Sequence, residues 1–443
     1  MDINENYSVI GAEPKKSSAI DKKSYFAITA LLVVLAVLLT FIITYACLDG
    51  KLSAQYEEYM ETVGEFKTIV ELYNALPEEM RNFEMYEKLA YIDAIYRSNY
   101  IGEIDEEKLI YSLLNGYIVG AGDQFGAYYT VDGFSAMMGE TEGNTVGIGV
   151  YVAVEETGYI KILYVMSNSP AYEAGLLPGD IITHIDGQSV TELGYYTAID
   201  MVKGEKGTEV EITVLRKGNS LTVKVNRDQV ETESIIYSKH QEDETVGVIR
   251  IIEFNNNTPE QFINAVTSLM DSGCKSLVFD LRNNPGGTLE SVVEMLDFML
   301  PKGDVVKIRY SDGYVQTYSS DNSGDEFTKL YGDNVKMAVL VNGNTASAAE
   351  LFTCALKDYG VAKIVGETTF GKGCGQNVLM LPDGDGLAVT TFLYDPPSSP
   401  NYNGVGIEPD VKVELSEEAA QKNIFELLHS EDNQLNKALE AIK

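Results

Sequence analysis

The chain has 443 residues, of which 45% are apolar and 23% charged, and this ordinary globular composition excludes a wholly disordered, collagenous or coiled-coil protein. Lys and Arg number 33 and Asp and Glu 67, so the formal net charge is −34, and so acidic a surface argues against nucleic acid as a partner. The 4 cysteines form no C-x-x-C pair and the 3 histidines (His184, His240 and His429) lie near no other metal ligand, so we expect neither a metal nor another cofactor.

Residues 25–48, YFAITALLVVLAVLLTFIITYACL, form the first distinctive segment because they carry no charge. As a helix, they are long enough to cross a hydrocarbon core of about 30 Å. A buried helix or a cleaved signal peptide are the alternatives. The apolar part of a signal peptide is usually shorter, about 7–15 residues, and residues 44–47 resemble a lipoprotein cleavage box only weakly. We therefore expect a retained transmembrane helix.

The charges that flank this segment predict its orientation. Four lysines precede it, and Glu57, Glu58 and Glu61 follow it closely. By the positive-inside rule, we expect residues 1–24 to be cytoplasmic and residues 49–443 to lie outside the cell membrane, which the chain crosses once. An odd number of cysteines, Cys274, Cys354 and Cys374, then lies outside, so at least one of these thiols should be free.

Residues 49–145 are expected to form a helical region followed by a linker. Apolar residues recur at steps of three and four from Tyr56 to Tyr73, which is typical of an amphipathic helix. The stretch 119–145 is rich in Gly and turn-forming residues and is interpreted as the linker. The helices of residues 52–118, together with a C-terminal helix at 416–443, are candidates for a lid or for an interface of a homo-oligomer.

Residues 146–228 change to a period of two, which predicts short strands with one helix near Tyr195 to Lys203. Here Gly147-Ile148-Gly149-Val150 resembles the carboxylate-binding loop of a PDZ domain, and residues 169–182 (SPAYEAGLLPGDII) resemble the central signature of bacterial PDZ domains. Successive backbone N–H groups in such a loop can hold a terminal carboxylate, and the adjacent strand edge can pair with the peptide. The simpler interpretation is that these glycines only form turns.

Residues 229–415 alternate strand and helix patterns, which predicts a β/α core with a mixed sheet. Within it, GETTFGKG at 366–373 has the spacing of a phosphate-binding loop. Its last position is Gly373, where Ser or Thr is needed, and a strand pattern follows instead of a helix. We therefore reject nucleotide binding.

Ser347 is the first candidate for chemistry. The spacing Ser347-x-x-Glu350 predicts a capping box, so Ser347 could simply cap a helix. If Thr345 is the cap instead, the Ser347 hydroxyl lies in the first turn, near the positive end of the helix dipole, which suits a nucleophile. Both interpretations stay open.

A serine nucleophile needs a base, and the β/α core contains no histidine between its first and last predicted strands. Lys372 lies between two glycines, and burial can lower the pKa of a lysine by several units, enough for it to act as a base. Gln376, four residues later, could hydrogen-bond the amine. Alone, Lys372 would be interpreted as a solvated loop lysine.

Residues 283–287, Asn-Asn-Pro-Gly-Gly, follow a strand and precede a helix. Glycines at such a turn let backbone N–H groups converge on an oxyanion. An ordinary strand-to-helix turn is the alternative.

Together, LRNNPGG, NTASAAE and GETTFGKGCGQ, with GVGIEPD at 404–410, closely resemble the carboxy-terminal processing (tail-specific) protease family over roughly residues 120–415. The resemblance implies an α+β (mixed) chain with a crotonase-like β/α core behind the PDZ domain. It implies a Ser–Lys dyad with Ser347 as nucleophile, Lys372 as general base and Gln376 orienting Lys372. The implied oxyanion hole combines the N–H of Ala348 with that of Gly286 or Gly287.

Two segments depart from the family pattern. Asp123-Gln124-Phe125-Gly126 replaces a usual Asp-Pro-Tyr-Ser-like run, and Pro396-Pro397-Ser398-Ser399-Pro400 replaces a Pro-x-Gly-Arg-like run. These departures concern lid contacts and substrate preference and leave the dyad intact.

The sequence thus predicts a membrane-anchored serine endopeptidase that cleaves extracytoplasmic proteins near free C-terminal tails recognised by its PDZ domain. A membrane-tethered PDZ scaffold on an inactive core is the alternative, and intact Ser347, Lys372 and Gln376 argue against it. A crotonase-like enzyme acting on thioesters is a weaker alternative, because the acidic chain offers no basic surface for a phosphorylated carrier.

Overall fold

The computed structural model describes residues 83–320, 326–332 and 334–443, and the chain divides into two compact units, residues 1–104 and 105–443. The predicted transmembrane segment, residues 25–48, lies outside the described residues. Among the helices that are described, none combines the length and the apolar character needed to cross a bilayer. The described helix of the first unit is α3 (Phe83–Asn99).

The second unit opens with α4 (Glu106–Gly120), in the region that we expected to be helical. The stretch 119–145, which we expected to be a linker, instead contains β1 (Ala127–Tyr129) and α5 (Val131–Glu142), so that prediction is wrong. Thr130 caps α5 by accepting the Gly133 N–H at 3.3 Å, and Gly143 ends the helix with a φ of 75°. The glycines inside α5 obscured its helical pattern in the sequence.

The PDZ domain has the predicted strands and helix. Its main sheet has the order β3-β4-β5-β7-β8, with β6 beside β5, and the two-stranded sheet β2-β9 joins it to the rest of the unit. The strands are β2 (Asn144–Gly147), β3 (Val150–Val154), β4 (Ile160–Val165), β5 (Ile181–Ile185), β6 (Gln188–Ser189), β7 (Glu209–Arg216), β8 (Asn219–Asn226) and β9 (Asp228–Glu231). The helices are α6 (Pro170–Glu173), α7 (Val190–Leu193) and α8 (Tyr195–Val202).

The β/α core is built on a six-stranded sheet of order β10-β11-β12-β15-β16-β19. Only the edge strand β10 is antiparallel to its neighbour, so the predicted mixed sheet is confirmed. These strands are β10 (Ile235–Lys239), β11 (Val246–Ile251), β12 (Ser276–Asp280), β15 (Lys336–Val341), β16 (Ala362–Gly366) and β19 (Val411–Lys412).

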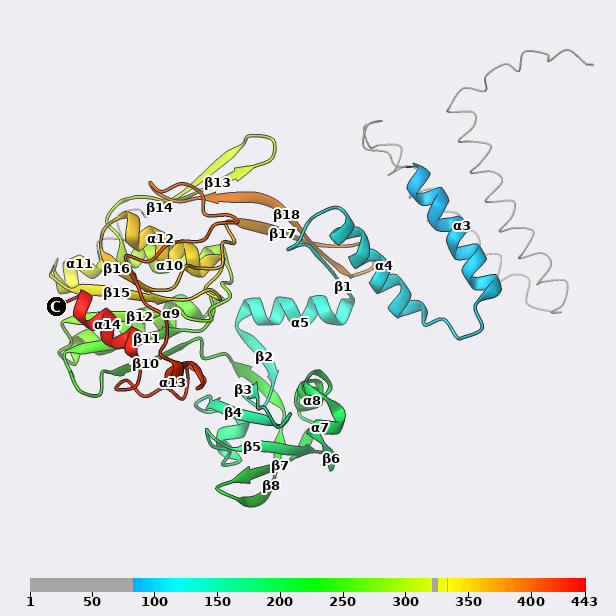
Figure 1. Ribbon diagram of the computed structural model, residues 1–443, viewed down its shortest axis with the longest axis horizontal. Coiled ribbons are helices and arrows are strands. Elements are labelled where there is room, and N and C mark those ends of the chain that lie inside the picture. Colours follow the sequence, from blue (N-terminus) through cyan, green and yellow to red (C-terminus); the bar gives the residue numbers. More distant parts are fainter. Residues whose placement is uncertain (1–82, 321–325, 333) are drawn as a thin grey trace, which may run out of the picture. The chain divides into compact units, whose positions relative to one another are not determined.

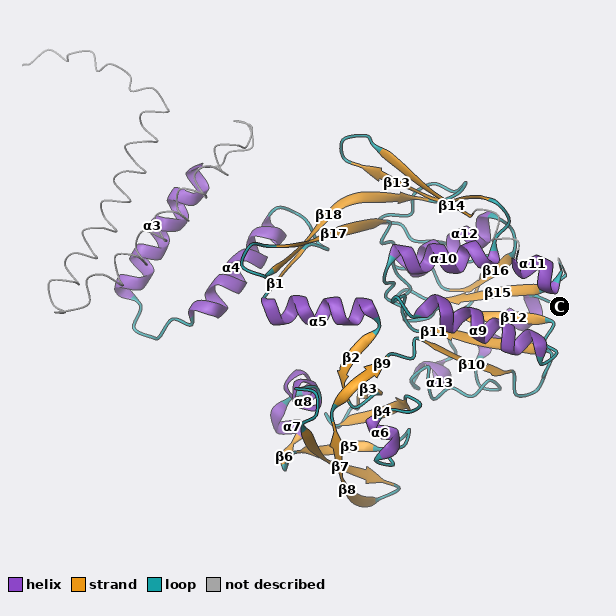
Figure 2. Ribbon diagram, turned by 180° about the vertical axis from the view of Figure 1, so that it is seen from behind, coloured by secondary structure: helices purple, strands orange, loops and turns teal. Residues whose placement is uncertain are grey.

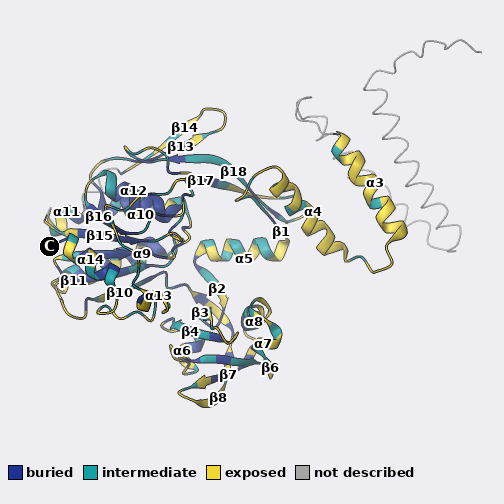
Figure 3. Ribbon diagram, in the orientation of Figure 1, coloured by how far each residue is buried: buried dark blue, intermediate teal, exposed yellow. Residues whose placement is uncertain are grey.

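Helices cover both faces of this sheet, as Figures 1 and 2 show. One face packs against α9 (Thr258–Asp271), α10 (Leu289–Met299) and α12 (Ala348–Asp358), and the other against α14 (Asn433–Ala441). Successive residues of a strand point to opposite faces, so Phe279 joins the first layer and Val278 the second. Burial on both faces explains the unbroken apolar run of β12. In Figure 3 the central strands appear buried, whereas α4 is largely exposed.

A second sheet, β1-β18-β13-β14 with β17 paired to β18, extends from the core. Its further strands are β13 (Gly303–Tyr310), β14 (Val315–Ser320), β17 (Cys374–Met380) and β18 (Gly386–Asp395). Two short helices complete the described unit, α11 (Glu326–Tyr331) and α13 (Glu417–Ala420). The single C-terminal helix predicted at 416–443 is divided, because α13 and α14 each have their own capping residue, Ser416 and Asp432.

Candidate active site

The three segments singled out in the sequence follow the carboxyl ends of three neighbouring strands. The turn at 283–287 follows β12, the turn that contains Ser347 follows β15, and the loop that contains Lys372 follows β16. Because these strands are parallel, their carboxyl ends share one edge of the sheet, where α/β proteins place their sites. The topology therefore brings the three segments together.

Ser347 stands at the N-cap position of α12, so Thr345 is not the cap. The Thr345 hydroxyl instead donates to the Leu281 carbonyl at 2.8 Å, which ties the turn after β15 to the end of β12. Ser347 has φ 56° and ψ −119°, a backbone conformation that costs of order 1–3 kcal/mol for a residue with a side chain and that concentrates at functional sites. The residue is buried, and the turn aims it at a cavity described below.

Glu350 links the turn that contains Ser347 to the loop that contains Lys372. Its Oε2 accepts the Ser347 N–H at 2.9 Å and the Lys372 N–H at 2.7 Å. Its Oε1 accepts the Gly371 N–H and the Thr369 hydroxyl at 2.7 and 2.6 Å. Burial raises the pKa of Glu350, while these four donors oppose that rise. The carboxylate thus has the partners a buried charge requires, and it sets the backbone of both loops.

Lys372 is half-buried, and its ammonium lies over the Phe125 ring, 4.8 Å from the ring centroid. Burial lowers the pKa of Lys372, although Cys374, Asp123 and Glu350 act in the opposite direction. A lowered pKa increases the neutral fraction that can take a proton. The Gln376 amide donates to the Thr390 hydroxyl at 3.0 Å, so its orienting role toward Lys372 stays a prediction.

The backbone N–H groups at and opposite the glycine turn differ in whether they already donate a hydrogen bond. The Gly286 N–H donates to the Asn284 side chain at 2.8 Å, whereas within the described part of the chain no hydrogen bond is seen for the N–H groups of Gly287 and Ala348. A Cβ on Gly286 would come within 2.7 Å of the Ser347 Cβ and 2.9 Å of the Ala348 nitrogen. The turn therefore lies directly against Ser347. Of the two predicted glycines, Gly287 suits an oxyanion better, because the Gly286 N–H already donates to Asn284.

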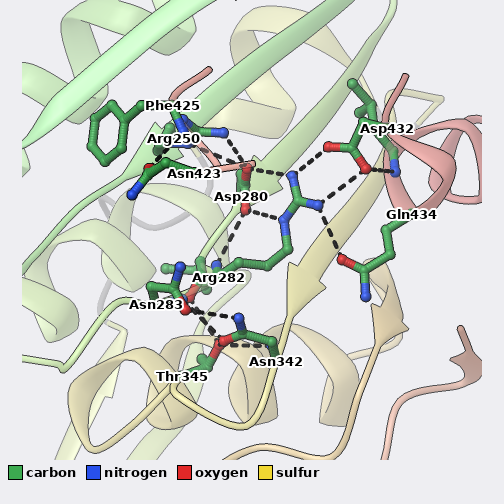
Figure 4. A network of polar contacts seen from close by, with 12 residues as sticks. Arg250, Asp280, Arg282, Asn283, Asn342, Thr345, Asn423, Phe425, Asp432 and Gln434 are labelled. Carbon is green, nitrogen blue, oxygen red and sulfur yellow. Dashed lines mark hydrogen bonds and ion pairs between the residues drawn. The ribbon is translucent and has the colours of Figure 1, made fainter. Parts of the chain in front are cut away.

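A buried ionic network precedes this turn, as Figure 4 shows. Arg282 donates to Asp280 at 2.8 and 2.7 Å and to Asp432 at 3.1 and 2.6 Å, and its Nη1 also donates to the Gln434 side chain at 3.0 Å. The Arg282 side chain is 1% exposed. Burial opposes ionisation of Asp280, but the charges of Arg282 and Arg250 outweigh it and lower the pKa of Asp280. Asp432, which caps α14, and Gln434, in its first turn, thereby hold the end of β12 that leads into the glycine turn at 283–287.

One cavity of about 620 Å³ contains the predicted chemistry. It is lined by Ser347, Lys372, Gln376, Gly286, Gly287, Phe125 and Tyr394, with apolar walls from Ile308, Tyr310 and Phe392. Tyr394 lines this cavity together with Ser347, and burial raises the pKa of its hydroxyl, so it stays protonated. Sequence reasoning did not single out Tyr394, Thr390 or the roles of Asp123 and Phe125.

A second cavity, of about 350 Å³, lies in the PDZ domain beside the predicted loop 147–150. Residues of β3 and α8 also line it, among them Val152, Tyr195 and Ile199. Gly149 has a φ of 79°, and a Cβ there would lie 2.4 Å from the Ser169 Cβ, so the loop requires glycine at this position.

The cysteines and potential metal ligands add no further centre among the described residues. Cys274, Cys354 and Cys374 are buried free thiols. Within the described ranges, no group of three or more His, Cys, Asp and Glu side chains has the arrangement of a metal site.

Comparison with known proteins shows the family to which this chain belongs. The model of peptidase family S41 matches residues 245–413, and a PDZ domain model matches residues 161–216. The chain is 30% identical over 336 residues to a probable CtpA-like serine protease of Staphylococcus saprophyticus, in an alignment that covers 75% of this chain and 67% of that protein. The chain belongs to the CtpA-like serine proteases of peptidase family S41. The family predicted from the sequence motifs is confirmed.

Further relatives and solved structures are also similar to this chain. A probable CtpA-like serine protease of Staphylococcus haemolyticus is 32% identical over 327 residues, which cover 74% of this chain and 64% of that protein. The chain therefore spans less than two thirds of the length of that relative. Among solved structures, a putative S41 protease from Bacteroides fragilis covers 79% of this chain and 96% of its own, with a TM-score of 0.52 and 17% identity, which indicates a shared fold. A photosystem II D1 C-terminal processing protease is 27% identical and covers 78% of this chain and 91% of its own, with a TM-score of 0.44.

Proposed function

We propose that this S41 protease is a serine endopeptidase in which Ser347 and Lys372 form the catalytic dyad and which cleaves proteins near their C-termini. One observation carries the proposal: Ser347, Lys372 and the turn Gly286–Gly287 line the same cavity. The shared hydrogen bonds of Glu350 to both catalytic loops support it.

In the first half of the proposed reaction, the neutral Lys372 amine takes the proton of the Ser347 hydroxyl as the oxygen bonds to the scissile carbonyl carbon. The carbonyl oxygen becomes an oxyanion, which the N–H groups of Ala348 and Gly287 stabilise. Such donors are each worth roughly 10²–10³-fold in rate. The Lys372 ammonium then gives its proton to the leaving amine, and the peptide C–N bond breaks.

In the second half, the acyl group remains on Ser347 as an ester. Lys372 takes a proton from a water molecule while the water oxygen attacks the ester carbon, and the same N–H groups stabilise the second oxyanion. Collapse of this intermediate returns the proton from Lys372 to the Ser347 oxygen and releases the new carboxyl terminus. The dyad therefore needs no histidine.

The PDZ cavity is proposed to bind the free C-terminal tail of the substrate protein. Backbone N–H groups at 147–150 suit the terminal carboxylate, and β3 offers an edge for pairing with the tail. Residues 25–48 are proposed to anchor the enzyme in the cell membrane, with the catalytic part outside, on the charge pattern of the sequence.

The test is a comparison of the full-length chain in detergent micelles with its Ser347→Ala variant. Both are incubated with a soluble protein that carries an unstructured apolar C-terminal tail, and the products are mass-analysed. Cleavage near the tail by the wild type, with none by Ser347→Ala, is the expected result. Equal cleavage by both proteins would contradict the proposed nucleophile.

A further inference from the structure

The Phe125 ring covers the ammonium group of Lys372, although the two residues lie far apart in the sequence. The Lys372 Nζ lies 4.8 Å from the centroid of the ring, and both residues line the active-site cavity. Phe370 contacts the Phe125 ring edge-on, with 6.4 Å between the centroids. The distance from ammonium to ring is that of a cation–π interaction.

The turn that carries Phe125 is held by the carboxylate of Asp123. That carboxylate accepts the N–H groups of Phe125 and Gly126 at 3.1 and 2.9 Å. It also accepts the Thr390 N–H at 2.9 Å and the Thr390 hydroxyl at 2.7 Å. Although burial opposes it, hydrogen bonding from Thr390 and from its own turn lowers the pKa of Asp123, so the carboxylate stays charged. The ring is therefore fixed to β18.

The same bonds extend to the predicted partner of the base. Thr390 accepts the Gln376 amide N–H at 3.0 Å while donating its hydroxyl proton to Asp123. Asp123, Thr390 and Gln376 thus form one chain of hydrogen bonds beside Lys372. The position of the Phe125 ring therefore depends on these hydrogen bonds as well as on apolar contacts.

The ring has two opposing effects on the base. Its bulk keeps water away from the amine, which disfavours the ammonium and lowers the pKa of Lys372. Its π face attracts the ammonium, which raises that pKa. The titratable groups that act on the pKa of Lys372 are Asp123 before β1, Glu350 on α12 and Cys374 on β17. The same cavity is also lined by other titratable side chains, namely Tyr129, Glu140, Glu253, Glu290, Tyr310, Tyr318 and Tyr394.

We propose that Phe125 is a positioning residue for the general base: its ring holds the Lys372 amine in place in the cavity of Ser347 and sets the pH at which the amine loses its proton. The inference rests on the proposed Ser–Lys dyad. It concerns a residue at which this chain departs from the usual Asp-Pro-Tyr-Ser-like run.

The test is the pH dependence of kcat/KM for the full-length enzyme in detergent micelles, whose acidic limb reports the pKa of the base in the free enzyme. Phe125→Leu keeps an apolar cover but has no π face, so the ammonium loses its attraction and the acidic limb should move to lower pH by roughly 0.5–1.5 units. Phe125→Tyr keeps both the bulk and the π face and should restore the wild-type profile.

The matched control is Phe370→Leu. It removes a ring of the same size that touches Phe125 and lies two residues from Lys372, but the ring is 54% exposed and covers no ammonium. Its acidic limb should coincide with that of the wild type. A variant that only loosens the fold would not move the limb to lower pH, because water entering the cavity favours the ammonium.

Fluorinated phenylalanines at position 125 provide a second measurement that preserves the shape of the ring. Fluorine withdraws electron density from the π face, so 4-fluoro- and then pentafluorophenylalanine should shift the acidic limb progressively to lower pH. An unmoved limb in both the Leu variant and the fluorinated series, with Lys372→Ala inactive, would overturn this inference alone. An active Lys372→Ala would overturn the dyad and this inference with it.

Discussion

Ser347 and Lys372 share one hydrogen-bond acceptor: the backbone N–H groups of both residues donate to Oε2 of Glu350, at 2.9 and 2.7 Å. The proposed nucleophile and the proposed base are thereby both held by one oxygen atom of a buried side chain. A shift of either loop must stretch a charge-assisted hydrogen bond, which is among the stronger kinds in proteins.

Replacing Glu350 by Gln should disrupt both loops. An amide NH₂ would face two of the four donors that the carboxylate accepts, and each buried donor left without a partner costs about 1–3 kcal/mol. We therefore expect Glu350→Gln to lower the free energy of unfolding by roughly 2–5 kcal/mol and to reduce kcat at least tenfold. Thermal unfolding and steady-state kinetics measure the two effects. Wild-type kcat in Glu350→Gln would show that the shared acceptor is dispensable.

Lys372→Arg should be as inactive as Lys372→Ala. Arginine keeps the positive charge, but its pKa above about 12 prevents it from acting as a base. A lysine with a structural or substrate-binding role should tolerate arginine far better. The measurement is the initial rate of tail cleavage by each variant. Substantial turnover by Lys372→Arg, with Ser347 still essential, contradicts the base role.

Arg282→Gln should destabilise the core by about 3–5 kcal/mol at neutral pH, because it leaves the buried Asp280 and Asp432 without their main counter-ion. Arg309→Gln is the matched control: its pair with Asp395 is 2.8 Å long but exposed and screened by solvent, so this variant should destabilise the core far less. Chemical denaturation at pH 7 compares the two. Similar costs for both variants would contradict the importance of burial here.

Arg282→Gln should also change how the free energy of unfolding depends on pH. Since the pKa of Asp280 is lowered in the folded state, its stabilisation is present above the unfolded pKa of about 3.9 and is lost as the pH falls through the folded pKa. Without Arg282, burial is opposed chiefly by Arg250, so the folded pKa of Asp280 rises toward the unfolded value, and the loss of stability on acidification should be smaller and should be complete at higher pH. Melting temperatures from pH 7 down to pH 2 measure this difference. Parallel curves for wild type and variant would count against it.

Amidating the C-terminus of the substrate should slow cleavage, because it removes the charge that the loop at 147–150 is proposed to bind. A coupling of 1–3 kcal/mol between tail binding and activity corresponds to about 5–150-fold in rate. Gly149→Leu should lower the rate on free tails but should add little on amidated tails, since both changes remove one interaction. Gly187→Leu, whose φ is also positive but whose Cβ meets open space, is the control for backbone strain. Equal rates on free and amidated tails by the wild type would disprove carboxylate sensing.

Local patterns predicted most of the fold. The apolar run of β12 and the alternation in the PDZ strands identify elements that the structure contains. Lys217 and Gly218 form the tight turn between β7 and β8, with φ values of 48° and 81°. The three candidate segments, which line one cavity, could be singled out because turns, glycines and a capping motif lie next to one another in the chain.

Relationships across the chain could not be predicted in this way. The spacing Ser347-x-x-Glu350 indicated one hydrogen bond of Glu350, but its other three donors come from residues 369–372 and depend on how two loops meet. Asp123 and Thr390 are 267 positions apart, and no periodicity connects them. Helix α5 was missed because its glycines are turn-forming residues by local preference, and tertiary packing overrides that preference.

Arg282 acquires Asp432 and Gln434 as partners 150 and 152 residues later in the chain. At synthesis rates of about 5–20 residues per second, a growing chain waits roughly 8–30 s between making this arginine and making the side chains that neutralise and hold it. The strand end that leads into the glycine turn is thus among the last parts of the core to be completed. The order of synthesis therefore delays assembly of the cavity that contains Ser347 and Lys372 until α14, on the opposite face of the sheet, has been made. A partly synthesised protease should consequently lack a finished active site while some of its own segments are still unfolded.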